Sequence, residues 1–317
     1  MDSDSLDDLD LQLLHALQID GRAAYSTIAE VLGVSARTVA RRYGRLRANG
    51  LVRVTGVATT GPIATAEWIV RITVRASGAT ALAHALAQRP DTAWVTVVDS
   101  GTEIACIFRI PGDGPAPLEA LARHRDVLDI SAHRLLHHFM DRRWRGRTSA
   151  LTATQVEALQ PPAIGTTQPL TPTDLDHRLL AALSLDGRAA YPDLARRIGW
   201  SETAIRRRLD ELRRAGILRF SVEIDPAAFG FTVSCVIWMS VVPHQLQAVA
   251  TALASDFEAA FIGATTGEHN LIAIAVFRSS AELYTYLTER ITALNGIERM
   301  ETTPIASYTK RDAQIFR

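Results

Sequence analysis

Residues 9–53 read LDLQLLHALQIDGRAAYSTIAEVLGVSARTVARRYGRLRANGLVR, and residues 175–219 read LDHRLLAALSLDGRAAYPDLARRIGWSETAIRRRLDELRRAGILR. The two stretches align without a gap at an offset of 166, and about 22 of 46 positions are identical when residues 8 and 174 are included. A solenoid needs at least three short repeats, whereas this chain has two copies at a long interval. The repeat therefore indicates that a whole folding unit was duplicated.

Each copy has the pattern of a helix-turn-helix. In the first copy, Leu9, Leu13 and Leu17 share one helical face, and Asp20-Gly21 ends that helix. A short helix over about 26–32 follows, Gly33 supplies a tight turn, and Ser35 stands where the N-cap of a third helix belongs. The third helix runs to about residue 48, and its counterpart to about residue 215. Because the same spacing occurs twice, the sequence predicts two such units.

The outward face of the third helix supplies the candidate DNA contacts. Val39, Tyr43 and Leu46 are spaced for the core, so at about 100° per residue Arg37 and Arg41 point away from it. The start of a recognition helix enters the major groove, where arginine commonly binds guanine. We predict these DNA-binding residues: Ser35, Arg37, Thr38, Arg41, Arg42 and Arg45 in the first copy, and Ser201, Thr203, Arg206, Arg207 and Arg208 in the second.

Alternatives to DNA contact remain open for these residues. Surface arginines are common, so a solvated helix face is the general alternative. Arg42 lies nearer the core edge, where a phosphate contact or an internal ion pair is expected. In the second copy, Thr203 corresponds to Arg37, and Asp210 and Glu211 replace Gly44 and Arg45. The two copies are therefore expected to read different half-sites, with the larger phosphate contribution from the first copy.

The segment after each third helix reads as strand–helix–strand–strand–helix–strand. In the first half, strands are expected over 68–74, 93–98, 104–110 and 130–139, with helices over 80–88 and 117–124. In the second half, the strands are 233–242, 260–264, 270–277 and 297–307, and the helices are 245–254 and 281–294. This order with short connections is ferredoxin-like. Its helices cover one face of the sheet, and the other face of one copy is expected to pack on the second copy.

The predicted fold class is α+β, with two helix-turn-helix (winged-helix-like) domains, each followed by a ferredoxin-like βαββαβ domain. Residues 151–172 are rich in Thr, Pro, Gln and Ala and read as a linker with a short helix over 154–159. The predicted boundaries are 1–55 for the first helix-turn-helix domain, 56–150 for the first βαββαβ domain, 151–172 for the linker, 173–220 for the second helix-turn-helix domain and 221–317 for the second βαββαβ domain.

The composition limits the other function classes. The chain has 34 basic and 34 acidic residues, so its net charge gives no sign of a nucleic-acid binder, and Lys310 is its single lysine. Cys106 and Cys235 lie in apolar runs and are expected to be buried, reduced thiols. The chain shows no apolar leader and no run of 18 apolar residues, which favours a soluble cytoplasmic protein without a membrane partner.

The residue types give little support to metal or catalytic chemistry. His133 and His137 would share a face on a helix, but with His138 they lie in an alternating strand, where they should not converge on a metal. The sequence has no glycine-rich phosphate loop, no nucleophile elbow and no paired-cysteine metal motif. We therefore expect no metal, no cofactor and no catalytic residue.

The repeated motif resembles the Lrp/AsnC family of feast/famine transcriptional regulators. The residues that carry the resemblance in the first copy are Leu9-Asp10, Leu13-Leu14, Arg22, Tyr25, Gly33, Ser35, Val39, Arg42, Arg45, Leu46 and Gly50. In the second copy, Ile205, Leu209 and Glu211 replace Val39, Tyr43 and Arg45, and the run 225–230 resembles the family's linker strand. The resemblance covers nearly the whole chain outside the linker and implies a tandem form of a regulator that normally has one unit.

The resemblance implies a small-molecule effector and further assembly. Family members pair their ferredoxin-like domains through the sheets, and many bind an amino acid or related metabolite near a Gly-x-Tyr-Asp turn. The corresponding turn is Thr266, Gly267, Glu268, His269 and Asn270 in the second half, with His269 and Asn270 where Tyr and Asp are usual. In the first half it is the run 99–103, with Asp99 and Gly101 as candidates, followed by a strand that is expected to be about three residues shorter.

The expected function is a sequence-specific, DNA-binding transcriptional regulator that responds to an amino-acid-like effector. Its expected partners are double-stranded DNA, that effector and a second copy of the chain, which would form a dimer of pseudo-dimers. Two alternatives stay open. One is an enzyme similar to the sirohaem decarboxylases, which share this two-domain architecture and would need a histidine-rich tetrapyrrole pocket. The other is a metabolite-sensing protein in which one helix-turn-helix no longer binds DNA.

Overall fold

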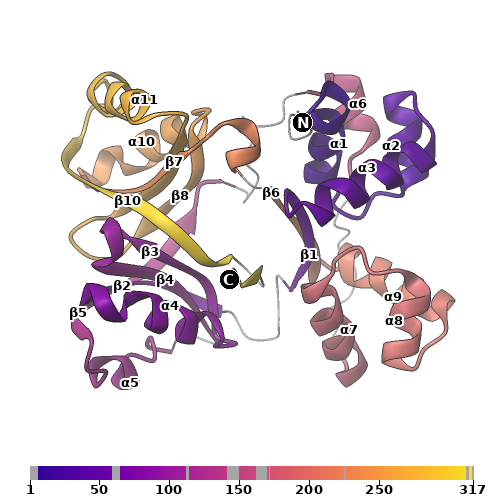
Figure 1. The fold of residues 1–317 in the computed structure, drawn as a ribbon, viewed down its shortest axis with the longest axis horizontal. Helices are drawn as coiled ribbons and strands as arrows, with labels where there is room; N and C mark the ends of the chain where they lie inside the picture. Colours follow the sequence, from indigo (N-terminus) through magenta and orange to yellow (C-terminus); the bar gives the residue numbers. More distant parts are fainter. Residues whose placement is uncertain are drawn as a thin grey trace. The chain divides into compact units, whose positions relative to one another are not determined.

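The chain forms two compact units, and each unit combines a segment from each half of the sequence. The computed structural model describes residues 6–58, 65–111, 114–140, 150–161, 170, 172–224, 226–311 and 314–315. Unit 1 contains residues 1–63 and 147–229, and unit 2 contains residues 64–146 and 230–317. Figure 1 shows the elements of both units. The like domains of the two halves are thus grouped together.

The first helix-turn-helix has the three expected helices. They are α1 (Asp8–Ile19), α2 (Tyr25–Leu32) and α3 (Ala36–Ala48). Asp7 and Asp10 cap α1 reciprocally, and Gly33 ends α2 in the left-handed conformation with a φ of 67°. Ser35 caps α3 by accepting a hydrogen bond from the backbone N–H of Thr38. Short-range capping therefore sets the boundaries of all three helices.

The second helix-turn-helix repeats this arrangement with α7 (Asp174–Leu185), α8 (Tyr191–Ile198) and α9 (Glu202–Arg214). Thr173 and Asp176 cap α7 reciprocally, and Ser201 caps α9. Pro192 is tolerated in the first turn of α8 because that position needs no N–H donor. A short helix, α6 (Ala153–Ala158), packs against the first helix-turn-helix core through Val156 and its neighbours. The expected linker helix is thereby found, while residues 162–169 and 171 lie outside the described residues.

Two strands that the sequence reading missed join the helix-turn-helix domains. β1 (Val52–Ala58) and β6 (Leu218–Ile224) pair antiparallel, from Val52 opposite Ile224 to Ala58 opposite Leu218. The expected boundaries at 55/56 and 220/221 fall inside these strands, so unit 1 extends past both. Residues 226–229 form a 3₁₀ turn where a linker strand was expected, and Asp225 lies outside the described residues. The expected linker strand is wrong because the strand ends before this turn.

The first half of unit 2 has the expected βαββαβ order. Its elements are β2 (Thr65–Val74), α4 (Ala79–Ala87), β3 (Thr92–Val98), β4 (Glu103–Pro111), α5 (Glu119–Ala122) and β5 (Val127–His138). The strand order is β3-β4-β2-β5, with all neighbours antiparallel. The helices cover one face, where Val70, Ile72 and Phe108 are buried with Leu82 and Leu86 of α4. This half is ferredoxin-like, as the sequence predicts.

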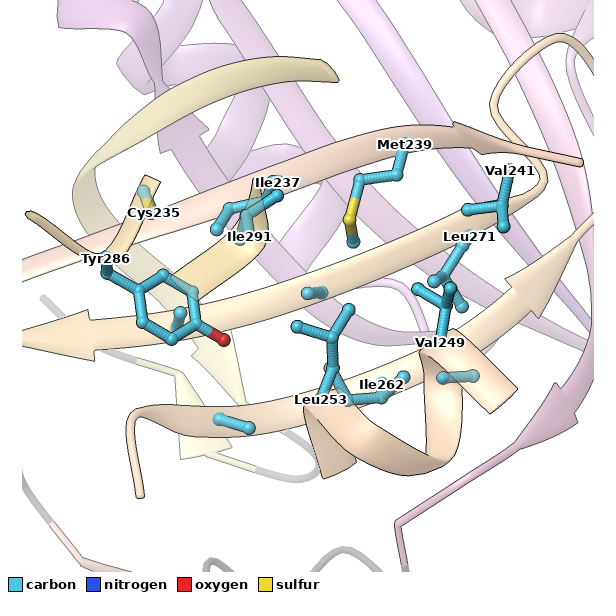
Figure 2. Packing of buried hydrophobic residues seen from close by; sticks show 14 of the residues in the cluster. Cys235, Ile237, Met239, Val241, Val249, Leu253, Ile262, Leu271, Tyr286 and Ile291 are labelled. Atoms are coloured by element: carbon cyan, nitrogen blue, oxygen red, sulfur yellow. The ribbon is translucent and has the colours of Figure 1, made fainter. Parts of the chain in front are cut away.

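The second half of unit 2 repeats the order. Its elements are β7 (Val233–Val241), α10 (Leu246–Ala254), β8 (Ala259–Thr265), β9 (Leu271–Phe277), α11 (Ser280–Thr285) and β10 (Ile297–Arg311), with β11 (Gln314–Ile315) beside the end of β10. Figure 2 shows Ile237 and Met239 of β7 packed with Val249 and Leu253 of α10. The expected helix 281–294 is in fact α11 followed by a π-helical segment, Tyr286–Ile291.

The two sheets of unit 2 join at both edges. β3 pairs with β10, and β5 pairs with β8, so the eight strands close in the order β10-β3-β4-β2-β5-β8-β9-β7 and return to β10. The inner faces share one apolar cluster that includes Ile69 and Leu135 from the first half and Val236, Trp238 and Ile272 from the second. The expected packing of one free sheet face on the other is therefore found in unit 2.

Candidate nucleic-acid interface

The outward face of α3 presents two exposed arginines. Arg37 and Arg41 are exposed, while Val39, Tyr43 and Leu46 on the opposite face are buried. Neither guanidinium has an ion pair or hydrogen bond to any residue that the structure describes. Thr38 is half-buried, and its hydroxyl lies 2.9 Å from that of Ser35 within the N-cap. The face that the helical spacing singled out is thus free to bind an anionic partner.

Arg42, Arg45 and Arg208 instead pair with buried carboxylates. Asp10 is fully buried, and it accepts hydrogen bonds from Arg42 (Nη1 to Oδ1, 2.9 Å) and from Arg45. In the second copy, Arg208 donates to both carboxylate oxygens of Asp176 at 2.7 Å, and Asp176 is also fully buried. The internal ion pair was the correct alternative for Arg42. These three guanidiniums balance charges inside their own domain, and Arg45 is still 47% exposed.

The pKa of Asp176 records this pairing. Desolvation by burial would raise the pKa, but hydrogen bonds from Arg208 and from Thr173 outweigh it and lower the pKa to about 2. The same pairing raises the pKa of Arg208. Asp176 therefore stays ionised in the folded protein over the whole physiological pH range, and Arg208 stays bound to it.

The outward face of α9 is basic but partly engaged. Thr203, Arg206 and Arg207 are exposed. The Arg206 guanidinium lies 4.4 Å from the centroid of the Tyr191 ring, and Arg207 Nε lies 3.5 Å from Glu211 Oε1. Such contacts between exposed groups are weak, so both arginines can exchange them for another partner. Ser201 serves as the N-cap by accepting from the N–H of Ala204 at 3.2 Å.

Two arginines that the sequence reading did not single out as site residues connect the helix-turn-helix domains. Arg22 donates to the carbonyl of Ala189 at 2.9 Å and to that of Gly187, and its guanidinium lies 4.8 Å from the Tyr191 ring centroid. Arg188 donates to the carbonyls of Gly21 at 2.7 Å and Ala23 at 2.9 Å. The residues correspond at the offset of 166, so this is a reciprocal exchange between the copies.

Two ion pairs also join the helix-turn-helix domains reciprocally. Arg47 Nη2 lies 2.8 Å from Asp186, and Arg213 Nη2 lies 2.8 Å from Asp20. These four residues also correspond at the offset of 166. With the β1–β6 ladder, they hold the two helix-turn-helix domains in one relative orientation. The identity of the Asp-Gly-Arg-Ala-Ala-Tyr run in both copies was the signal in the sequence, but a turn motif does not reveal its partner.

An open basic groove lies where the two helix-turn-helix domains meet. It has a volume of about 770 Å³ and is lined by Arg47, Asp186, Arg188, Ala189, Ala190, Asp193, Arg196 and Arg197. Arg196 pairs with Asp193, and both are largely exposed. The corresponding positions in α2 are Glu30 and Val31 in place of Arg196 and Arg197. The basic charge of α8 therefore has no equivalent in the first copy.

The turn at 266–270 is held by the opposite half of unit 2. Thr266 accepts a hydrogen bond at its hydroxyl from the N–H of Arg134 (2.8 Å), and its carbonyl lies 2.9 Å from His133 Nδ1. Gly267 has a φ of 102°, and a Cβ there would lie 2.3 Å from His133 Nδ1. Asn270 bonds both the N–H and the carbonyl of Val241, at 2.8 and 2.7 Å. The turn is therefore preformed, with His133 over its glycine.

Glu268 and His269 complete this turn beside a buried tryptophan. Glu268 pairs with Arg299 at the surface, and the His269 ring centroid lies 6.5 Å from that of Trp238. The centroid of the His133 ring lies 6.1 Å from that of the Trp238 ring. Trp238 is 1% exposed, and its buried Nε1–H has no acceptor among the described residues. This buried donor beside the turn calls for a further polar partner.

The corresponding turn in the first half has different chemistry. Asp99 and Ser100 both adopt positive φ (52° and 56°), and Gly101 follows with 94°. Glu103 binds Arg71 through both oxygens at 2.9 Å, whereas its counterpart Asn270 binds backbone. The strand after this turn, β4, has nine residues against seven in β9, so the expectation of a shorter strand is wrong. His137 and His138 of β5 contact different neighbours, Phe139 and Glu67.

Comparison with known proteins identifies the family. The AsnC-type helix-turn-helix model matches residues 6–47 and 173–213, and the Lrp/AsnC ligand binding domain model matches residues 234–315. An uncharacterised HTH-type transcriptional regulator of Pyrococcus furiosus is 33% identical over 138 residues, which are 43% of this chain and 93% of that protein. The chain belongs to the Lrp/AsnC family. It is a DNA-binding transcriptional regulator with a ligand-binding domain, and it carries the helix-turn-helix twice.

Of two further comparisons, one covers less than half of this Lrp/AsnC protein and the other covers nearly all of it. The HTH-type transcriptional regulator FL11 of Pyrococcus horikoshii is 26% identical over 143 residues, which are 45% of this chain and 94% of that protein. The crystal structure of the siroheme decarboxylase NirDL has a TM-score of 0.65 at 14% identity and covers 98% of this chain and 94% of its own. The likeness to NirDL shows that the whole fold is shared. Among the described helices, none has the length and apolar character needed to cross a bilayer.

Proposed function

We propose that one chain reads an asymmetric DNA site with two unlike helix-turn-helix domains. The observation that carries the proposal is the exposed pair Arg37 and Arg41, which has no partner in the described part of the chain, on a helix whose domain is fastened to the second copy by Arg22 and Arg188. Fastened domains offer two recognition helices at one spacing, which is how this class of protein selects half-site separation. Such a regulator acts on chromosomal DNA in the cytoplasm.

The two copies divide the contacts. Arg37, Thr38 and Arg41 read bases in the first half-site, since unpaired guanidiniums at the start of a recognition helix suit guanine. The second copy has Thr203 in place of Arg37, and its exposed arginines are Arg206 and Arg207 on α9 and Arg196 and Arg197 on α8. Those groups bind phosphates, which adds affinity without a base preference.

The effector of this regulator is an amino-acid-like molecule that binds at the turn 266–270. The preformed backbone of Gly267, the rings of His133 and His269 and the unused Trp238 N–H offer donors to a carboxylate. Binding there would change how the fastened pairs of two assembled chains are spaced, and so change DNA affinity. Two chains are proposed to assemble further as a dimer of pseudo-dimers, which would present four recognition helices.

The test is DNA selection followed by matched substitutions. Fragments are selected from random DNA with the wild-type chain, and affinities and salt slopes are then measured for R37A/R41A, for R206A/R207A and for the control R123A/R125A, which removes two exposed arginines outside unit 1. We expect the first variant to lose sequence preference and the second to lose affinity uniformly. Equal losses in the first two variants with unchanged preference would contradict the proposal, as would an equal loss in the control.

A second candidate function rests on the whole-chain likeness to NirDL. That enzyme has the same tandem fold, and here His133 and His269 flank Trp238 in unit 2. A sirohaem decarboxylase-like enzyme would bind an iron tetrapyrrole and would not need free arginines on α3. Titration of the purified chain with an iron porphyrin decides: a saturable Soret shift that H133A removes favours the enzyme, and an unchanged spectrum together with salt-sensitive DNA binding favours the regulator.

A further inference from the structure

Two equivalent positions in unit 2 carry unlike residues. Arg71 lies opposite Ala105 of β4 and Ser131 of β5, and Trp238 lies opposite Ile272 of β9 and Glu301 of β10. Since both halves have the same strand order, Arg71 corresponds to Trp238 and Ser131 corresponds to Glu301. The residues that differ are thus known position by position from the strand register.

Arg71 and Trp238 also contact each other. The guanidinium carbon of Arg71 lies 4.7 Å from the centroid of the Trp238 ring. Two equivalent positions that meet must lie beside the axis that relates the halves. Arg71 further donates to Glu301 of the other half at 2.6 and 3.0 Å. These hydrogen bonds lower the pKa of Glu301 and, although desolvation opposes it, raise the pKa of Arg71.

Pairing of like halves would lose this complementarity. Two first halves would bring Arg71 against a second Arg71, with Ser131 in place of Glu301 and thus no carboxylate from the opposite half. Two second halves would place two Trp238 rings together and leave both Glu301 carboxylates without a guanidinium. In the first case two guanidiniums meet, each paired only with its own Glu103, and in the second case two carboxylates lose their guanidinium, so both pairings of like halves are disfavoured.

The ends of β10 and β5, which form the two joined edges, also carry unlike residues that each suit the opposite half. Lys310 of β10 is 7% exposed and donates to the carbonyl of Arg89 at 2.7 Å and to the Thr92 hydroxyl at 3.2 Å, both in the first half. The strand end that corresponds to Lys310 in the first half is Phe139-Met140, where Met140 is buried in the apolar core of the second half and Phe139 packs against that core. Each strand end therefore fits the unlike half and not a second copy of its own half.

We propose that the inner sheet face of each half of unit 2 accepts only the unlike half. The chain thereby closes on itself through this face, and like halves of a second copy or of a single-unit relative are excluded from it. Arg71, Trp238 and Glu301 set this choice of partner, and Lys310 supports it. Further assembly of the chain then has to use other surfaces.

The experiment measures exchange, defined as a disulfide between full-length chains of different peptide tags that forms only where two first halves pair. One tagged chain carries L135C and the other carries V98C. Leu135 lies opposite Thr265, whereas its equivalent Ile305 lies opposite Val98, so the two cysteines meet only in a pair of like halves. R71W/E301S makes the axis positions alike, because Trp then faces Trp and Ser corresponds to Ser. After mixing and mild oxidation, exchange should be about tenfold higher than between chains with the wild-type axis residues, since a coupling of ordinary size between contacting residues is lost. E301S alone keeps the pair Arg71–Glu103 and should give a smaller rise.

The control separates partner choice from loss of stability. R290Q removes a guanidinium that binds Asp256 within the second half and lies outside the axis contact. Exchange that rises in the axis variants and stays at the wild-type level in R290Q supports the proposal. Exchange that stays flat in folded R71W/E301S, or that rises equally in R290Q, overturns it. If the double variant does not fold, E301S decides, because Glu301 is 44% exposed and its truncation leaves no cavity.

Discussion

Arg22 and Arg188 bind each other's domain by the same contacts. Arg22 donates to the carbonyls of Gly187 and Ala189, and Arg188 donates to those of Gly21 and Ala23, so each guanidinium closes the turn that precedes the other copy's second helix. Each also lies over a tyrosine of the other copy, Tyr191 and Tyr25. One folded chain therefore carries its recognition helices as a fastened pair.

We expect R22M and R188M each to lower the free energy of unfolding of unit 1 by about 2 kcal/mol, because each leaves two carbonyls without a charged donor. Each substitution also weakens the contact that fixes the relative orientation of the two helix-turn-helix domains. The DNA fragments that either variant selects should therefore include more than one spacing between half-sites. Urea unfolding and a set of fragments with altered spacers measure the two effects. R178M, which removes a single surface hydrogen bond to the carbonyl of Arg197, is the control and should change neither.

Acid should weaken the second helix-turn-helix through Asp176. Its pKa is about 2 in the folded chain, against an ordinary value of 3.8, so its stabilisation is complete above pH 3.8 and is lost as the pH falls through 2. The loss amounts to about 2 kcal/mol. Unfolding by urea at pH 5 and at pH 2 should show D176N losing that much less than the wild type across this interval. Parallel losses in the two proteins would rule out Asp176 as the source.

Two glycines in unit 1 should respond oppositely to alanine. A Cβ at Gly187 would lie 2.9 Å from the Thr55 backbone carbon, and backbone cannot yield, so G187A should destabilise the β1 contact by about 1–3 kcal/mol. Gly44 lies within α3 with no atom inside 4 Å of such a Cβ, so G44A should stabilise by about 1 kcal/mol. Thermal unfolding compares them, and a stable G187A would show that β1 does not approach this turn.

Substitution of Gly267 by alanine should remove effector binding at the turn 266–270. G267A places a methyl group against His133 and strains a φ of 102°, whereas G101A in the corresponding turn meets no atom within 4 Å and adds only the backbone strain. We expect both variants to bind DNA without effector, and G267A alone to lose the change in affinity that an amino acid causes. The measurement is DNA affinity with and without each candidate amino acid. A normal response in G267A would place the effector elsewhere.

The sequence predicted what depends on local pattern. Apolar spacing located the six helix-turn-helix helices, and alternation located the strands of both βαββαβ domains. Arg37 and Arg41 were placed correctly because an α-helix has a fixed period. What escaped prediction depends on partners far along the chain: β1 pairs with a strand 160 or more residues away, as in Val54 with Val222, and Arg42 turns inward to Asp10. A basic residue at the core edge has two possible partners, and only the fold selects one.

The presence of Thr203 where the first copy has Arg37 has a consequence for how such a regulator changes over generations. In an assembly of identical subunits, one codon change alters both recognition helices at once. Each operator then needs a mutation in both of its half-sites to be bound again. Here α3 and α9 are encoded separately, so one recognition helix can change while the other still binds its own half-site. New target sites are then reachable by single steps.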